Sequence, residues 1–311
     1  MVARTLEARA SRRRSHPIRK ALRLLIALAV LLLGAFAVNG LSFANGIVPL
    51  VGEETGIAPS VPSTTQVKVL AWNLNKCGVH RGGLVFAEPE EVRARIARIA
   101  GVIRAENPDL VFLSEIVKEC GFCNVDQVRE LARACGMTHW LFGENYNFGL
   151  PFLRLVGGNA ILAKRPLTAV ANPDLVGRRP FWITTNNRRV LFGSAEIGGR
   201  TILLAALHLD SFDAGNNLRQ MAQVAVFELG MPLLAAGDFN AEPDSKTLKL
   251  ILDSGRVAGA VTGPPTYPQD APNQRLDYVL GPSDWKLIDS RVLDDHASDH
   301  RAVVSTFAFG Q

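Results

Sequence analysis

The sequence predicts an α/β protein with mixed β-sheets, preceded by one N-terminal hydrophobic helix. Three observations lead to this class. An uncharged apolar run lies near the N-terminus, a strand–helix–strand unit follows it, and the later part of the chain alternates short apolar strands with fewer helices. A chain of 311 residues, 48% of them hydrophobic and 20% charged, is long enough to bury one large core.

The N-terminal segment has the anatomy of a membrane anchor or an export signal. Residues 24–38 are apolar and uncharged, and eight Lys and Arg residues lie before them with a single acidic residue. We therefore expect a basic cytoplasmic segment over 1–23 and a transmembrane anchor or signal segment over 24–45. Small residues at Ala35, Ala37 and Ala44 also suit a signal peptidase, so a retained anchor and a cleaved signal both fit. Either outcome places the remaining chain outside the cytoplasm, at the cell membrane or secreted.

The charge of the chain is unevenly distributed. The net charge is +5, but residues 46–311 carry 26 basic and 28 acidic side chains, a balance of about −2. Such a domain has no global positive field to attract nucleic-acid phosphates, although a local basic groove is compatible with this balance.

Four cysteines lie in the exported region, namely Cys77, Cys120, Cys123 and Cys135. An oxidising compartment favours two disulfides, whose pairing the sequence leaves open. Free thiols and a metal site using the C-x-x-C spacing are the alternatives.

The order of elements indicates one domain. Residues 46–65, rich in Glu, Thr, Pro and Ser, are predicted to form a linker, and 66–311 to form the domain. Gly198-Gly199 predicts a tight hairpin turn, because glycine accepts positive φ. Strands are expected over 67–72, 110–113, 159–163, 189–197, 201–207, 233–236, 276–280, 290–293 and 302–307, and helices over 88–106, 125–135, 217–228 and 245–252.

Polar residues recur where the predicted apolar strands end. Each cluster alone has a plain structural explanation: Glu115 as an exposed carboxylate, His208 as a core histidine, Asp238 or Asp299 as a turn cap. Together they supply carboxylates, amides and imidazoles at matching strand ends, which favours a reactive site. The clusters are Trp72-Asn-Leu-Asn75, Leu113-Ser-Glu115, Ala206-Leu-His-Leu-Asp210, Gly237-Asp-Phe-Asn-Ala-Glu-Pro243, Arg275-Leu-Asp-Tyr278 and Ser298-Asp-His300.

The order of these motifs resembles the endonuclease/exonuclease/phosphatase superfamily, over about residues 67–309. The combination of G-D-F-N with a C-terminal S-D-H is specific to this group. The resemblance implies a four-layered α/β sandwich with two mixed β-sheets, of the deoxyribonuclease I type, and a hydrolase of phosphoester bonds whose site lies at one sheet edge. A catalytically inactive phosphate-binding module is the non-enzyme alternative.

The resemblance also implies residue roles. Glu115 is the expected principal ligand of Mg²⁺, with Mn²⁺ as the alternative metal, assisted by Asn73 or Asn75 and by Asp299. His300 is the expected general base, oriented by Asp277. Asp238 positions the attacking water or protonates the leaving oxygen, while Asn240 and His208 hold phosphate oxygens. Two positions depart from many relatives: Ser114 stands where Gln is common, and Asn75 where some have Asp.

The substrate remains open between two classes. We expect an endonuclease- or phosphodiesterase-like enzyme acting as a monomer, with a lipid or inositol phosphoesterase of the sphingomyelinase type as the alternative. The partner is therefore nucleic acid or phospholipid, besides the membrane itself. Two segments bear on the choice: the apolar loop 147–153, which could enter a bilayer or pack internally, and a basic–aromatic cluster suited to a phosphate backbone, formed by Arg178, Arg179, Phe181, Trp182, Arg188 and Arg189.

Overall fold

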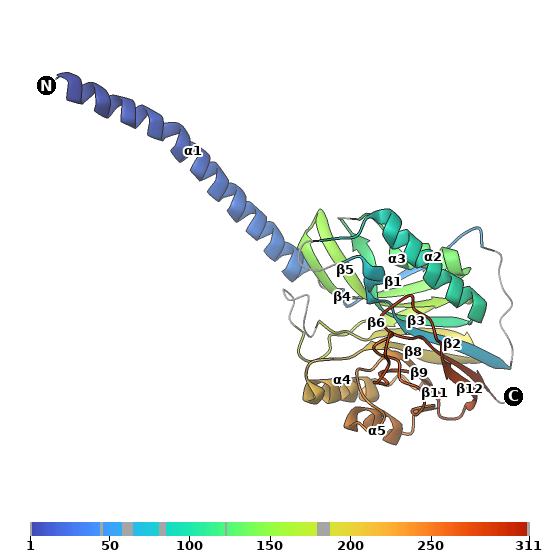
Figure 1. Cartoon of the computed structure of the whole chain (residues 1–311). Coiled ribbons are helices and arrows are strands. Elements are labelled where there is room, and N and C mark those ends of the chain that lie inside the picture. Colours follow the sequence, from blue (N-terminus) through green and yellow to red (C-terminus); the bar gives the residue numbers. More distant parts are fainter. Residues whose placement is uncertain are drawn as a thin grey trace.

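The fold was analysed in a computed structural model of the whole chain. It describes residues 2–43, 46–57, 65–80, 85–121, 123–178 and 187–309, and for residues 2–16 and 42–43 it describes the backbone only. An N-terminal helix extends away from a two-sheet domain, and the C-terminus lies on the opposite side of that domain (Figure 1).

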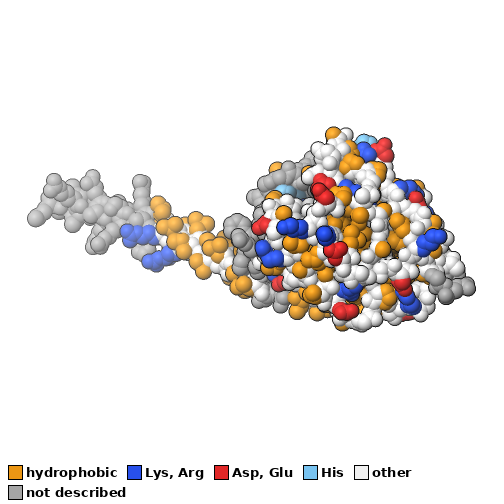
Figure 2. Space-filling view, turned by 90° about the horizontal axis from the view of Figure 1, so that it is seen from below, with side chains coloured by type: hydrophobic (Ala, Val, Ile, Leu, Met, Phe, Trp, Pro, Cys, Tyr) orange, Lys and Arg blue, Asp and Glu red, His pale blue; other side chains and the backbone are white. Residues whose placement is uncertain are grey.

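The N-terminal helix α1 (Val2–Val38) continues into a short π-helix, η1 (Asn39–Phe43). Residues 17–41 are long and apolar enough to cross a membrane, judged by length and composition alone. No protein covers the most apolar part of this stretch. In Figure 2 its apolar side chains form a band between the basic side chains and the domain.

Seven strands form the first sheet, in the order β1-β4-β5-β3-β2-β13-β12. The central pair β2–β3 is parallel and the others are antiparallel, so the sheet is mixed. Its strands are β1 (Leu50–Glu53), β2 (Gln66–Asn73), β3 (Leu110–Cys120), β4 (His139–Leu150), β5 (Leu153–Ala163), β12 (Lys286–Val292) and β13 (Val303–Ala308).

Six strands form the second sheet, in the order β10-β11-β9-β8-β7-β6. Here β8 and β9 are the parallel pair. The strands are β6 (Thr168–Ala171), β7 (Leu191–Ile197), β8 (Arg200–His208), β9 (Leu233–Asp238), β10 (Val257–Gly259) and β11 (Asp277–Pro282). The predicted Gly198-Gly199 turn is confirmed: it joins β7 to β8, and both glycines have positive φ, 60° and 75°.

Three apolar cores separate four layers. One core lies between the two sheets and includes Val69 and Phe112 from the first and Leu204 from the second. The other two lie under helices on the outer faces. The first outer face carries α2 (Pro89–Glu106) and α3 (Gln127–Cys135), and the second carries α4 (Ala214–Val226) and α5 (Lys246–Asp253), as Figure 1 shows. The expected four-layered sandwich of two mixed sheets is confirmed.

Part of the predicted linker belongs to the domain instead. Residues 50–53 form β1, which pairs with β4 at the edge of the first sheet. The following Glu54 is buried, and Arg129 and the indole of Trp140 donate hydrogen bonds to its carboxylate. The linker prediction failed because a four-residue edge strand has exposed apolar side chains and no clear alternation. The remaining part, residues 58–64, lies outside the described residues.

The four cysteines are buried thiols that no disulfide joins, so the two expected disulfides are not found. Cys77 follows β2, and Cys135 ends α3. Burial raises the pKa of each of these two thiols to about 12. Cys120 and Cys123 lie in hydrogen-bonding contact, and that contact together with burial raises the pKa of Cys123.

Candidate active site

The polar strand ends predicted from sequence converge at one edge of the two sheets. In the first sheet Asn73 lies opposite Ser114, the residue before Glu115. In the second sheet Asp238 lies opposite both His208 and Asp277. The carboxyl ends of parallel strands meet at one sheet edge, and here each sheet contributes one parallel pair.

The first and last motifs are joined directly. The indole N–H of Trp72 donates to the carbonyl oxygen of His300 at 2.8 Å, and the hydroxyl of Ser298 donates to the carbonyl oxygen of Asn73 at 2.7 Å. These bonds span more than 220 positions in the sequence. The W-N-x-N motif therefore fixes the backbone that carries the S-D-H motif.

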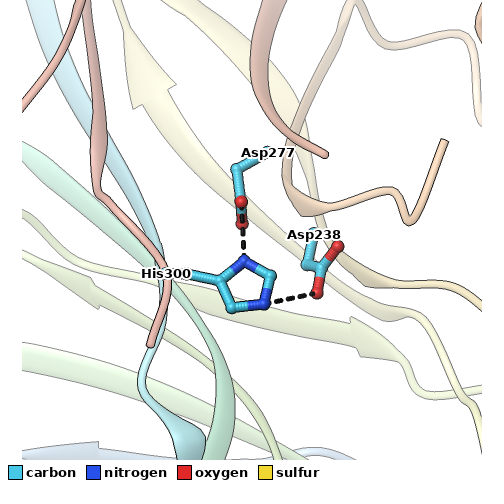
Figure 3. A group of neighbouring side chains, drawn as sticks. All are labelled: Asp238, Asp277 and His300. Carbon is cyan, nitrogen blue, oxygen red and sulfur yellow. Dashed lines mark hydrogen bonds and ion pairs between the residues drawn. The ribbon is translucent and has the colours of Figure 1, made fainter. Parts of the chain in front are cut away.

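His300 lies in a row with two buried carboxylates (Figure 3). Its Nδ1 lies 2.8 Å from Oδ2 of Asp277, and its Nε2 lies 3.8 Å from Oδ2 of Asp238. The other oxygen of Asp277, Oδ1, is buried without a hydrogen-bond partner among the described residues. The predicted pairing of Asp277 with the ring of His300 is therefore present, with Asp238 on the other side of the ring.

The charges of this row determine its protonation. Burial disfavours the imidazolium of His300, but the negative charges of Asp277 and Asp238 outweigh burial and raise the pKa of His300 to about 10. Burial and the charge of Asp277 raise the pKa of Asp238 to about 6, against the opposing effect of His300. A ring held as a cation cannot accept a proton, so the protonation of this row favours Asp238 over His300 as the proton acceptor.

Asp238 is held in place by two amide groups. The side-chain NH₂ of Asn73 donates to its Oδ2 at 3.0 Å, and the backbone N–H of Asn240 donates to its Oδ1 at 2.9 Å. Asn240 has a φ of 46° and also donates its side-chain NH₂ to the carbonyl oxygen of Leu209 at 3.0 Å. The structure thus makes Asn240 a residue that orients Asp238.

Glu115 and Arg188 lie on opposite sides of the ring of His208. Nε2 of His208 is 3.8 Å from Oε1 of Glu115 and 3.5 Å from Oδ2 of Asp238. Oε2 of Glu115 accepts a hydrogen bond from the ammonium of Lys76. Burial would raise the pKa of Glu115, but the charges of Lys76 and Arg188 outweigh it and lower that pKa. Glu115 is therefore an anion at neutral pH.

The other two expected ligands lie at the margin of the site. Asp299, next to His300, is exposed as a whole residue, but partial desolvation of its carboxylate and the charge of Glu115 raise its pKa. Asn75 is exposed, and it is its backbone N–H that donates to the side-chain oxygen of Asn73. The structure brings Asp299 toward Glu115 but shows no such approach for the side chain of Asn75.

The residues at this edge fit a hard divalent cation. Glu115 and Asp299 supply carboxylate oxygens, the ligands that Mg²⁺ prefers. The ammonium of Lys76 already places one positive charge beside Glu115. Asp238, Asp277 and His300 form a second cluster, whose ligand atoms lie within 4.8 Å of one another. That cluster suits Mg²⁺ less well, because one of its three members is a ring nitrogen and Nδ1 of that ring already pairs with Asp277.

Two residues of the site were not predicted as functional on their own. Lys76 lies in a turn where Asn75, Lys76 and Cys77 all have positive φ, between 43° and 56°, and this backbone directs it to Glu115. Arg188 contacts Nδ1 of His208 at 3.2 Å. Sequence reasoning had placed Arg188 only in a general basic cluster, and Lys76 carried no signal beyond following the W-N-x-N motif.

The other two described members of that basic cluster, Arg178 and Arg189, are engaged in ion pairs within the protein. Arg189 is fully buried and pairs with Asp174 and Glu144, and Arg178 also pairs with Asp174. Their charges are therefore largely neutralised within the protein. Arg179, Phe181 and Trp182 lie outside the described residues.

Solved structures of known proteins share this architecture. One is an endonuclease/exonuclease/phosphatase from Beutenbergia cavernae DSM 12333, with 24% identity, a TM-score of 0.60, and coverage of 79% of this chain and 72% of the other. Another is the catalytic domain of human Nocturnin with bound sulfate, with 19% identity, a TM-score of 0.58, and coverage of 84% and 98%. A third is the mannosyl-6-phosphatase Bt3783 of Bacteroides thetaiotaomicron VPI-5482, with 15% identity, a TM-score of 0.56, and coverage of 78% and 100%.

These likenesses, all below 25% identity, show a shared fold. No curated protein matches the chain in sequence. The sequence profile described as the Endonuclease/Exonuclease/phosphatase family matches residues 70–300. That range includes each of the polar strand-end clusters, from Trp72 to His300. The chain belongs to the endonuclease/exonuclease/phosphatase family.

Proposed function

We propose that this protein is a divalent-metal-dependent hydrolase of phosphoester bonds that acts outside the cytoplasm. The observation that carries the proposal is the buried row Asp277–His300–Asp238, placed next to the anionic Glu115 at one sheet edge. A proton acceptor, a proton donor and a metal-ligating carboxylate within one site are the parts that hydrolysis of a phosphoester needs.

Each side chain has a task set by its protonation. Asp238, with a pKa near 6, is largely ionised at neutral pH and accepts a proton from the attacking water. His300 is held as a cation by its two carboxylates, so it offers an N–H and a positive charge to a phosphate oxygen. Asp277 keeps the ring of His300 in place through Nδ1. His208 offers a second N–H from its Nε2.

Mg²⁺ is the metal that we propose, with Glu115 and Asp299 as its protein ligands. When bound, it would neutralise charge on the phosphate and stabilise the developing negative charge of the leaving oxygen. Lys76 would compete with the metal, because its ammonium already occupies one oxygen of Glu115. Asn75 is a weaker candidate ligand, since its side chain lies exposed in the turn after β2.

The N-terminal helix supports a location at the membrane. Its apolar stretch 17–41 is uncovered by protein and follows a basic segment, a combination typical of an anchor with its basic end in the cytoplasm. The domain that follows would lie on the other side. A reporter enzyme fused to the C-terminus and active only outside the cytoplasm tests this orientation, and reporter activity in the cytoplasm would contradict it.

Two observations bear on the class of substrate. The printed names of structural neighbours include a mannosyl-6-phosphatase and Nocturnin, at identities that show only a shared fold. The ion pairs of Arg178 and Arg189 remove two of the residues on which an endonuclease reading rested. A lipid or sugar phosphoester is therefore at least as well supported as nucleic acid.

The direct test is an activity panel on the full-length chain in detergent. The panel compares plasmid DNA, RNA, phospholipids, inositol phosphates and a chromogenic phosphodiester, with Mg²⁺ and with EDTA. We expect Mg²⁺-dependent hydrolysis of at least one phosphoester, and loss of it in Asp238→Asn with the circular dichroism spectrum unchanged. If the protein binds a phosphoester but hydrolyses none of the substrates in the panel, it is instead an inactive phosphate-binding module.

A further inference from the structure

The end of the N-terminal helix packs against the hairpin formed by β4 and β5. The side chain of Asn39 donates to the side-chain oxygen of Asn147 at 3.0 Å, and both residues are buried, with 1% and 2% of their surface exposed. The rings of Phe36 and Phe148 meet edge to face, with centroids 5.3 Å apart. A polar and an aromatic contact together fix the helix to the hairpin.

The two contacts also fix a direction. Passing from Asn39 to Phe36 moves along the helix toward its N-terminus, and the partners pass from Asn147 to Phe148, toward the tip of the hairpin. The tip, where Leu150 pairs with Leu153, therefore lies beyond these contacts on the side of the apolar stretch of α1. Figure 1 shows the end of α1 meeting the domain beside β4 and β5.

The length of the apolar stretch sets the depth of these contacts. A helix needs about 20 residues to cross the hydrocarbon core of a bilayer. Counted back from Gly40, about 20 residues reach Ala21, which leaves Lys20 outside the span and Arg23 in its first turn, where a long side chain can reach the interface. Phe36 then lies inside the outer end of the span, and Phe148, which touches it, lies at a similar depth.

The hairpin tip has the composition that such a position requires. Residues 149–153 read Gly-Leu-Pro-Phe-Leu and carry no charge. Phe152 exposes 74% of its surface, so this side chain does not pack internally, whereas Leu150, Pro151 and Leu153 are half-buried. The first charged residue after the tip, Arg154, is paired with Glu119 at 2.7 Å. An exposed aromatic side chain at the tip of a hairpin that packs against an apolar helix is suited to the boundary between water and lipid.

We propose that the tip of the β4–β5 hairpin, Leu150 to Leu153, inserts into the lipid surface beside α1 and holds the domain in one orientation on the membrane. The partner of this surface is the bilayer. The proposal rests on the anchoring put forward above but not on catalysis. It also requires that α1 is retained, because cleavage after Ala37 would remove Phe36, the ring partner of Phe148, and cleavage after Ala44 would also remove Asn39, the partner of Asn147.

The orientation places the site near the membrane. Glu115 lies next to Ile116, which pairs with Gly158 of β5, six residues from Phe152. At about 3.4 Å per residue, the site is on the order of 20 Å from the tip along the strand. The hairpin thus limits how far the reactive edge can turn from the bilayer.

The test uses tryptophan fluorescence of the full chain in phosphatidylcholine vesicles with brominated acyl chains, which quench only nearby indoles. Phe152→Trp places the probe at the tip. Ile288→Trp is the control, because Ile288 is an exposed apolar residue of β12 at the opposite edge of the same sheet. The wild-type signal is subtracted in both cases, and the intact mass of the purified protein reports whether residues 1–44 are retained.

We expect loss of the added fluorescence in Phe152→Trp, unchanged added fluorescence in Ile288→Trp, and a full-length mass. The proposal is overturned if brominated lipid quenches neither indole, or if it quenches the indoles at positions 152 and 288 equally. A mass that shows cleavage of the N-terminal segment would overturn it as well. If Phe152→Trp fails to fold, Leu150→Trp carries the same test. None of these readouts depends on hydrolysis, so an inactive protein would refute the proposed function and leave this result intact.

Discussion

The guanidinium of Arg188 lies 3.2 Å from Nδ1 of His208. A guanidinium can only donate, so Nδ1 must be the unprotonated nitrogen, and Nε2 carries the proton. Burial and the charge of Arg188 both lower the pKa of His208 well below its usual value. The contact therefore fixes His208 as a neutral ring whose N–H faces Asp238 and Glu115.

Without Arg188, the proton of the His208 ring should no longer be confined to Nε2. We expect Arg188→Met to lower kcat by about 10- to 100-fold, the usual effect of removing a group that orients a reactive residue. A change in the ¹⁵N chemical shifts of the His208 ring would show that the effect passes through the imidazole. Arg200→Met is the control, because Arg200 pairs with Asp284 at the surface. Unaltered His208 shifts in Arg188→Met would contradict the assignment.

Glu115 should control the response to metal. We expect Glu115→Gln to fold normally and to lose most activity at limiting Mg²⁺, with partial recovery when Mg²⁺ is in excess, because an amide is a weaker ligand than a carboxylate. Glu119→Gln on the same strand is the matched control, since that carboxylate pairs with Arg154 away from the site. Activity titrated against Mg²⁺ distinguishes the two, and superimposable titrations would exclude Glu115 as a ligand.

Lys76 should compete with the metal. Its ammonium occupies one oxygen of Glu115, and its charge repels a second cation. Lys76→Met should therefore bind Mg²⁺ more tightly than the wild type, measured by isothermal titration calorimetry. Weaker binding in this variant would show that Lys76 instead positions Glu115 for the metal.

His300 and Asp277 should act as one unit. His300→Ala removes the proton-transferring ring, and general acid–base groups typically contribute about 10²- to 10⁴-fold in rate. Asp277→Asn should also slow the reaction, because an amide can present the wrong group to Nδ1. The double variant should be little slower than His300→Ala alone, since Asp277 then has no ring to orient. Losses that multiply, with folding verified by circular dichroism, would mean independent roles.

The thiols should resist alkylation in the native protein. Burial raises the pKa of Cys77 and Cys135 to about 12, so few thiolates exist at pH 8, and thiolate is the reactive form. Iodoacetamide without a reductant should label these cysteines slowly in buffer and all four cysteines quickly in denaturant, as counted by mass spectrometry. Absence of labelling in denaturant would reveal disulfides after all.

The sequence predicted an element correctly where the residues of one strand or one motif were enough to define it. The β2–α2–β3 unit and the Gly198-Gly199 hairpin follow from local apolar spacing and glycine conformation. β4 was missed because its middle, Gly143-Glu-Asn-Tyr-Asn147, interrupts the apolar pattern with polar residues, of which Asn145 and Asn147 are buried in the structure. The burial of an asparagine depends on a partner, and for Asn147 that partner is Asn39, more than 100 positions away.

Residues of the site could likewise be predicted only where a local motif marked them. Glu115, Asp238, Asp277 and His300 could be named because their motifs end apolar strands. Lys76 and Arg188 could not, because a positive-φ turn and a contact across the second sheet place them. The protonation of His300 was also beyond local reasoning, because it depends on a second carboxylate, Asp238, that approaches the ring from another strand.

The bond from the Trp72 indole to the carbonyl oxygen of His300 has a consequence for biogenesis. β13, which begins three residues after His300, is the last of the described strands and fills the position between β2 and β12. A ribosome that has made the first 290 or so residues has therefore produced neither Asp299 nor His300, and contacts of such long range form late in folding. The nascent chain therefore lacks the complete row Asp277–His300–Asp238 until synthesis has passed His300, and the candidate site closes only after that.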